Sequence, residues 1–159
     1  MSTAFERITI GVPRIIGAHT FTAGEIKRFA SAWDPQRFHM DEAEAEASSF
    51  GALAASGWHT ASAMMRLLVD TFARDAAEAL ARGEKPVVHG PSPGFEALKW
   101  SRPVFAGDTI TYTATVTAKR LSKSRPGWGI VTTDIAGTNQ KGEAVFAMTA
   151  QAFARTDGG

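Results

Sequence analysis

The stretch that decides the fold is Gly57–Arg82, which reads GWHTASAMMRLLVDTFARDAAEALAR. It contains no proline and is rich in alanine, leucine, methionine and arginine, all of which favour helices. Its apolar side chains recur at the spacing of a helix face, at Trp58, Ala61, Met65, Leu67, Leu68, Phe72 and Leu80. The pattern predicts one long helix. In a chain of 159 residues, a helix of this length has to lie centrally, packed along a sheet.

The chain after this helix has the composition of a β-sheet. Threonine, valine, isoleucine and phenylalanine recur with two-residue alternation from Gly94 to Thr156. Strands are predicted at Ile110–Lys119, Gly129–Thr138 and Ala144–Arg155, with turns at Ser124–Gly127 and Asn139–Gly142. Short turns connect antiparallel neighbours. The proline- and glycine-rich segment Gly83–Gly94 is predicted to be a loop.

The part before the long helix is predicted to hold one strand and two helices. The strand is predicted at Phe5–Val12 and the second, short helix at Met40–Ser48. The first helix begins near Thr22, with Glu25 placed to complete a capping box. It ends at Asp34, because Pro35 disfavours helical backbone at the residue before it. A helix-rich first half followed by an antiparallel sheet indicates an α+β fold, with the long helix against one face.

Length and composition narrow the class of protein. The chain fits a single domain, residues 1–159, with enough length for a hydrophobic core. Its 17 basic and 16 acidic residues give no electrostatic reason to expect nucleic acid or a membrane as partner. The absence of cysteine excludes disulfides, thiol catalysis and cysteine-bound zinc. The first residues lack the apolar core of a signal peptide, and no run approaches the roughly 18 apolar residues of a membrane span, so a cytoplasmic protein is expected.

The segment Trp33–His39, which reads WDPQRFH, is the first candidate for chemistry. Asp34 and His39 lie on either side of a proline that interrupts the helix, so both side chains can reach one small volume. A carboxylate beside an imidazole is a general acid–base pair that can share a water molecule. The alternative is structural, because aspartate before proline also begins turns and a lone histidine often bonds only to the backbone.

The second candidate is Gly57, which leads into the long helix directly after Ser56. The first turn of a helix has unpaired N–H groups, and glycine lets a substrate carbonyl approach the backbone closely. Such a position can stabilise a developing oxyanion. The alternative is that glycine only allows the helix to enter the fold tightly.

These residues resemble a known family, the MaoC-like dehydratases or (R)-specific enoyl-CoA hydratases. Three blocks match in the family's order, namely Asp34–His39, Ser56–Thr60 and Gly94–Val104 with the following Gly107–Thr109. The resemblance implies a hot-dog fold, in which a sheet wraps around a long central helix. The chain departs from the family pattern at Gln36, where asparagine is common, at Arg37, and at Met65, where relatives often carry a serine that helps to hold the aspartate.

The resemblance also implies a function. The expected reaction is the reversible hydration of a trans-2-enoyl-CoA, or a related enoyl thioester, to the (R)-3-hydroxyacyl thioester, without a metal or redox cofactor. His39 would activate the water, Asp34 would orient it and handle the proton at C2, and the Gly57 amide would stabilise the thioester oxygen. The sequence does not distinguish which of His39 and Asp34 protonates C2. Substrate contacts are expected from Trp33, Phe38, Trp58, His59 and Arg102, although the apolar residues and His59 have core packing as an equal or better alternative.

Two further expectations concern partners and rival functions. A lone protomer would leave a strand edge open, so a homodimer or a dimer of dimers is expected. One rival function is an acyl-CoA thioesterase on the same fold, but these enzymes place a carboxylate on the central helix and Gly57–Val69 has none. The other rival is a non-catalytic subunit that binds acyl thioesters, with Gln36 and Arg37 marking a lost activity.

Overall fold

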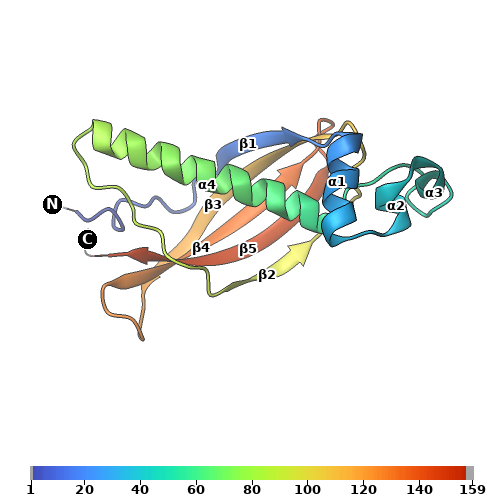
Figure 1. Cartoon of the computed structure of the whole chain (residues 1–159). Coiled ribbons are helices and arrows are strands. Elements are labelled where there is room, and N and C mark those ends of the chain that lie inside the picture. The colour runs from blue at the N-terminus through green and yellow to red at the C-terminus, as the bar shows by residue number, and fades with distance from the viewer. Residues whose placement is uncertain (1, 157–159) are drawn as a thin grey trace.

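The computed structural model describes residues 2–156, which form one antiparallel sheet and four helices. The elements are β1 (Arg14–Thr20), α1 (Ala23–Trp33), α2 (Arg37–Met40), α3 (Glu42–Glu46), α4 (Gly57–Ala81), β2 (Gly94–Lys99), β3 (Thr109–Leu121), β4 (Trp128–Thr138) and β5 (Ala144–Arg155). The strand order is β1-β3-β4-β5-β2, and every pair is antiparallel. The curved sheet lies along α4 (Figure 1), so the predicted α+β hot-dog arrangement is confirmed.

The core lies between α4 and the sheet face that it covers. Met64 on α4 and Tyr112 on β3 are almost completely buried, and the Tyr112 hydroxyl donates a hydrogen bond of 2.9 Å to the Thr60 carbonyl. This bond ties the first turns of α4 to the middle of the sheet. The other large and almost fully buried apolar side chains are Phe21, Ile26, Ile110, Ile135, Val145 and Phe146.

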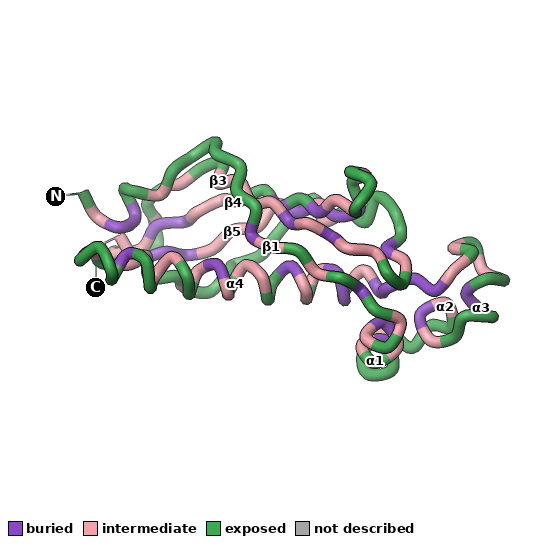
Figure 2. The backbone as a smooth tube through the Cα atoms, turned by 90° about the horizontal axis from the view of Figure 1, so that it is seen from above, coloured by how far each residue is buried: buried purple, intermediate pink, exposed green. Residues whose placement is uncertain are grey.

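The long helix is as predicted, but the buried face is only partly so. Leu67 and Leu68 pack against the core, whereas Trp58, Met65 and Leu80 are 53%, 48% and 64% exposed. Figure 2 shows buried and exposed positions alternating along α4 with the helical period. The sequence misled because apolar residues occur on both sides of this helix, so their spacing alone does not select the side that meets the sheet.

The predicted opening strand at Phe5–Val12 is wrong. These residues form turns and bends, and the strand is β1, which pairs with β3 at the sheet edge. Three carbonyls of the turn, at Phe5, Glu6 and Ile8, accept hydrogen bonds from the Lys119 ammonium group instead of from a neighbouring strand. The true strand lacks clean alternation because a register shift between Ile15 and Gly17 interrupts it.

The segment between β1 and α4 forms the end of the molecule opposite the chain termini (Figure 1). The capping box predicted for α1 is present, with Thr22 and Glu25 each bonding to the other's backbone N–H. The second helix predicted at Met40–Ser48 is split into α2 and α3. The split falls at Asp41, whose extended backbone and side-chain bond to the Glu44 N–H begin α3.

Candidate active site

The end of α1 and the short helix α2 bring Asp34 and His39 together. Asp34 is the C-cap residue of α1, and its backbone N–H still donates to the Ala30 carbonyl at 2.9 Å. The chain then turns through Pro35 and re-enters a helix at Arg37. As a result the Asp34 Oδ2 and His39 Nε2 atoms lie 3.4 Å apart. The kink at the proline thus brings the two side chains to face each other.

His39 has a fixed orientation and tautomer. Its side chain is almost fully buried, and its Nδ1 lies 2.6 Å from the carbonyl oxygen of Ala54. A carbonyl can only accept, so Nδ1 carries the proton of the neutral ring and Nε2 presents a lone pair. The Phe38 ring packs edge-on against the imidazole at a centroid distance of 4.6 Å. The lone pair of Nε2 is therefore held toward Asp34.

Asp34 is held as a carboxylate. Its Oδ1 accepts a hydrogen bond of 2.7 Å from the Gln36 side-chain amide, and the hydroxyl of Ser56, the N-cap residue of α4, donates to the same carboxylate. Burial by itself raises the pKa of Asp34. The hydrogen bonds from Ser56 and Gln36, together with the charge that His39 carries when protonated, outweigh burial and leave the pKa below its usual value.

The facing atoms of this pair are both acceptors. A lone pair on neutral His39 Nε2 and a carboxylate oxygen of Asp34 repel each other at 3.4 Å unless a hydrogen lies between them. Either a proton on Nε2 or a water molecule donating to both atoms satisfies the geometry. A water about 2.8 Å from each acceptor has ordinary hydrogen-bond lengths. The arrangement can therefore hold one water molecule with both of its hydrogens engaged.

Gly57, the first residue of α4, follows Ser56 directly. Within residues 2–156, its backbone N–H has no hydrogen-bond acceptor, as expected for the first turn of a helix. A Cβ at this position would lie 2.4 Å from the Trp100 indole, so glycine is required for the close approach of that ring. Trp100 packs edge-on against Trp58, with ring centroids 5.2 Å apart. The N–H is free to donate to a ligand beside an aromatic wall.

The remaining sequence-predicted contacts divide between several places. Phe38 lies against the dyad, and Trp58 lies beside Gly57 and Trp100. Trp33 and His59 instead line a hollow between α1 and α4, whose lining does not include Asp34 or His39. Arg102 is exposed and lies 3.9 Å from the Glu143 carboxylate at its nearest approach. Among residues 2–156, the ionic partner of its guanidinium is Glu143 and not a member of the dyad.

The sequence does not by itself reveal the residues that support the dyad. Ser56 is only 1% exposed and holds Asp34, although in the sequence it is only the residue before Gly57. Gln36 departs from the family pattern, yet its amide bonds to the aspartate. Met65 lies on the exposed side of α4. Ser56 and Gln36 thus hold the aspartate in this chain, and the polar side chain at the helix N-cap was the available signal.

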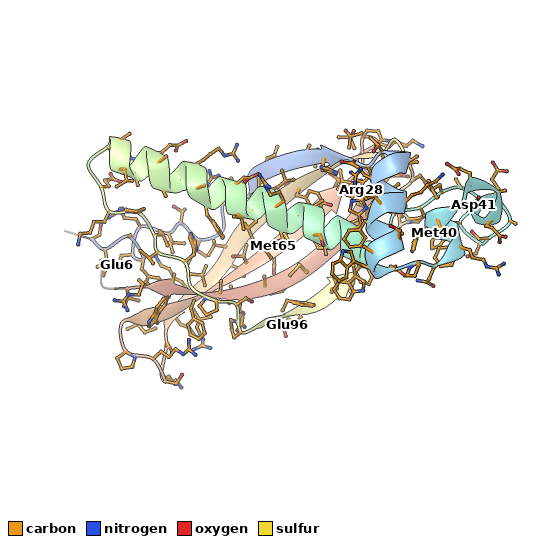
Figure 3. The ribbon with its side chains drawn as sticks, in the orientation of Figure 1. Glu6, Arg28, Met40, Asp41, Met65 and Glu96 are labelled. Atoms are coloured by element: carbon orange, nitrogen blue, oxygen red, sulfur yellow. The ribbon has the colours of Figure 1, made fainter. Side chains whose placement is uncertain are left out.

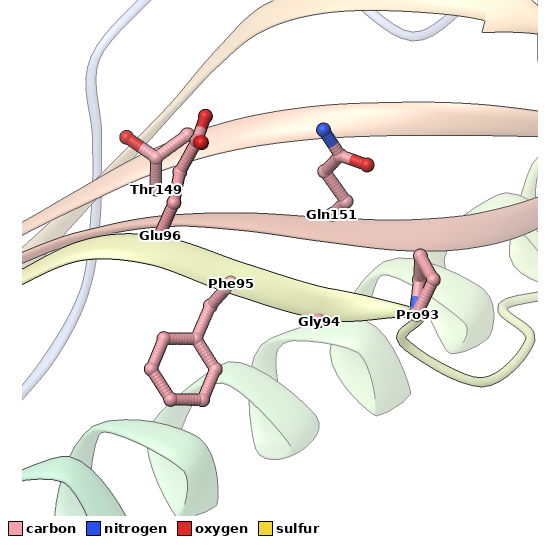
Figure 4. Close-up of a pocket in the computed structure, with 6 residues that line it drawn as sticks. All are labelled: Pro93, Gly94, Phe95, Glu96, Thr149 and Gln151. Carbon is pink, nitrogen blue, oxygen red and sulfur yellow. The ribbon is translucent and has the colours of Figure 1, made fainter.

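A second hollow, of about 220 Å³, lies between β2 and β5 (Figure 4). Glu96, Thr149 and Gln151 point to one side of the sheet there, and Phe95 points to the side of α4. This hollow contains no histidine and no paired acid–base groups. It lacks the features of a catalytic site.

The family model described as "MaoC like domain" matches residues 10–138, which include the dyad, α4 and most of the sheet. The chain belongs to the MaoC-like family. At the level of the family, this membership places the chain among hydratases and dehydratases. No curated protein matches the chain.

Several solved structures are similar to this MaoC-like chain. A MaoC-like dehydratase from Rhodospirillum rubrum is 38% identical with a TM-score of 0.81, and the match covers 98% of each chain. A monoamine oxidase regulatory protein from Archaeoglobus fulgius is 27% identical with a TM-score of 0.76, covering 98% of this chain and 95% of that one. An (R)-hydratase from A. caviae involved in PHA biosynthesis shares the fold at 24% identity and TM-score 0.66, covering 92% and 97%.

None of the helices within residues 2–156 is both long enough and apolar enough to cross a membrane. In the same part of the chain, no group of three or more histidine, aspartate or glutamate side chains is arranged to hold a metal ion.

Proposed function

We propose that this MaoC-like protein catalyses the reversible hydration of a trans-2-enoyl-CoA to the corresponding (R)-3-hydroxyacyl-CoA. The observation that carries the proposal is the 3.4 Å separation between His39 Nε2 and Asp34 Oδ2, two acceptors that a single water molecule can bridge. Membership of a family of hydratases and dehydratases supports the same reaction.

His39 is the base in this proposal. Its Nε2 takes one proton of the bridging water while the water oxygen forms a bond to C3 of the enoyl thioester. The electrons of the C2–C3 double bond move toward the thioester carbonyl, which becomes an enolate. The imidazolium then returns the proton to C2, so that one water has been added and the enzyme is unchanged. Asp34, whose pKa is lowered, stays ionised and orients the water through its second hydrogen.

Gly57 supplies the electrostatic part of catalysis. Its free N–H at the start of α4 donates to the thioester oxygen as negative charge develops there. The helix end adds a partial positive charge in the same direction. One donor of this kind is worth about 10²–10³-fold in rate.

The experiment is to follow loss of the enoyl chromophore of crotonyl-CoA and to determine the configuration of the product. Asp34→Asn keeps the size of the side chain but removes the charge that orients the water, and a loss of about 10²-fold or more is expected. Asp70→Asn is the matched control, because Asp70 forms an exposed ion pair with Arg66 on α4. Near-wild-type hydration by Asp34→Asn overturns the proposal, and release of free thiol without hydration assigns a thioesterase instead.

We also infer that the functional unit is a homodimer. The edge of β2 that faces away from β5 pairs with no strand of residues 2–156. Next to this edge lies an exposed apolar surface that a second copy would cover, made of Trp58, Met65, Val69, Phe95 and Trp100, each 42–53% exposed. Isolated exposed apolar residues are common, but several of them on a helix and at the neighbouring edge strand favour an interface.

Sedimentation velocity tests this inference. The wild type is expected to sediment as a dimer at micromolar concentration. Phe95→Asp places a charge in the proposed interface and is expected to shift the equilibrium toward monomer. Ile15→Asp is the control, since Ile15 is also exposed but lies on β1 at the opposite sheet edge. A stable wild-type monomer contradicts the inference.

A further inference from the structure

A hollow of about 420 Å³ lies between α1, the end of β1 and the first turns of α4. It lies outside the proposed catalytic site, because Asp34, His39 and Gly57 are not among its lining residues. Figure 3 shows Arg28 on α1 next to the start of α4, on the rim of this hollow. The volume is in the range of pockets that hold small organic molecules.

His59 is the buried polar group of this hollow. The residue is 9% exposed, and its ring stacks on Phe29 at a centroid distance of 4.7 Å and an interplanar angle of 5°. Neither ring nitrogen forms a hydrogen bond with any of residues 2–156, and Nδ1 is sealed from solvent. Nε2 is therefore the nitrogen that is open to the hollow. Because no acceptor reaches the sealed Nδ1, the proton of the neutral ring belongs on Nε2, and the acceptor for that N–H has to come from whatever occupies the hollow.

Arg28 is the charged group of the hollow that suits an anion. The other charged lining residue, Glu25, is held 3.5 Å from His19 and by hydrogen bonds from Thr22, so its carboxylate has partners of its own. Arg28 forms no ion pair and no side-chain hydrogen bond within residues 2–156. An unpaired guanidinium is suited to a carboxylate, which it can bind with two parallel hydrogen bonds.

His59 itself is suited to donate rather than to carry charge. Burial and the neighbouring positive groups lower its pKa to about 4, so the ring is neutral near pH 7. The neutral tautomer with its proton on Nε2 places a donor in the hollow. A carboxylate at this point is then bound by Arg28 and by a neutral N–H.

The rest of the lining is apolar and aromatic. Trp33, which is 77% exposed, forms one wall, and Phe29, Ala32 and Ala63 continue the surface. An exposed indole beside an unpaired arginine offers stacking area to a flat apolar group. We propose that this hollow binds a small carboxylate with a flat apolar body, with its carboxylate on Arg28 and His59 Nε2 and its body against Trp33.

Isothermal titration calorimetry with 3-phenylpropionate, as a probe of this chemistry, tests the proposal. A dissociation constant of about 1 mM or tighter is expected for the wild type. The uncharged 3-phenylpropanamide and the variant Arg28→Gln are each expected to bind roughly tenfold more weakly or worse, because a charge-assisted bond is lost. Arg66→Gln is the matched control, since it removes an arginine elsewhere on the surface and should leave the affinity unchanged.

Two further variants locate the site. His59→Phe keeps the stack on Phe29 but removes both nitrogens, so it should weaken binding several-fold while circular dichroism shows a folded protein. Asp34→Asn removes the proposed catalytic carboxylate and should bind the probe as the wild type does, which separates this proposal from the proposed function. The Trp33 indole resonance, identified by its loss in Trp33→Phe, should shift on titration. The proposal is overturned if the wild type shows no saturable binding up to about 10 mM probe. It is also overturned if Arg28→Gln binds the probe as tightly as the wild type, or if Asp34→Asn abolishes binding, which would place the probe at the dyad.

Discussion

His39 and His59 are two buried histidines near the start of α4, and they differ in every contact that matters for chemistry. His39 is 5% exposed and has both ring nitrogens assigned, one to the Ala54 carbonyl and the other toward Asp34. His59 is 9% exposed and is held only by aromatic stacking. Burial alone therefore does not identify a catalytic imidazole. The partner at each nitrogen does, because it fixes the tautomer and the direction of the lone pair.

The largest expected effect tests this contrast on the rate of hydration. His39→Ala removes the proposed base and should lower kcat by about 10²–10⁴-fold. His59→Ala should cost less than about tenfold, since the His59 ring packs against His19, Phe21 and Phe29 rather than against the dyad. Both variants are measured with crotonyl-CoA under the same conditions. Equal losses in the two variants would mean that the two histidines are not functionally distinct.

The second expected effect concerns Gly57, which lies between the two regions. Gly57→Ala places a methyl group 2.4 Å from the Trp100 indole, so the free energy of unfolding should fall by about 1–3 kcal/mol. Denaturant unfolding measures this, and the double variant with Trp100→Ala should show non-additive recovery. Gly24→Ala is the control, because a Cβ there meets nothing within 4 Å. If Gly57→Ala and Gly24→Ala lower the free energy of unfolding equally, the close packing of Trp100 on Gly57 is contradicted.

The third expected effect is a contribution of His59 to the pH dependence of the free energy of unfolding. The folded pKa of His59 is about 4, below the value of 6.5 in the unfolded chain, so the unfolded state binds the proton first as pH falls. Stability from this group is thus present above pH 6.5 and is lost progressively toward pH 4. His59→Phe should lose about 2 kcal/mol less stability than the wild type between about pH 7.5 and about pH 4.5.

Urea unfolding at both pH values measures this difference. Part of the acid sensitivity should persist in His59→Phe, because burial also lowers the pKa of His89, and that histidine remains. Parallel losses of stability in the wild type and in His59→Phe would show that His59 is not protonated preferentially in the unfolded chain.

The smallest expected effect concerns the support of the dyad. Ser56→Ala removes a donor to the Asp34 carboxylate, so the pKa of Asp34 should rise and kcat should fall roughly tenfold. The acid limb of the pH profile of kcat/KM should move to higher pH, which a purely structural role of Ser56 would not cause. Ser31→Ala removes an exposed hydroxyl that bonds only to the Arg28 carbonyl and should leave the profile in place. If the acid limb of the kcat/KM profile stays in place in Ser56→Ala, Ser56 does not support the Asp34 carboxylate in this way.

Much of the fold was predictable because it depends on local patterns. The capping box of α1, the extent of α4 and the three long strands follow from capping residues, composition and alternation within short windows of sequence. The strand at Phe5–Val12 was wrong because apolar alternation competes there with a turn whose carbonyls bond to Lys119. A contact between residues more than 100 positions apart leaves no local pattern.

The candidate site was predictable only in part for the same reason. The sequence by itself determined that Asp34 and His39 lie on either side of a proline kink and that Gly57 begins the long helix, because backbone geometry over a few residues fixes both. Only the tertiary structure decided that Ser56 holds Asp34, that Trp100 covers Gly57 and that His59 is buried without a partner. Those relations depend on how α1, α4 and β2 dock, and docking is set by the packing of the whole core.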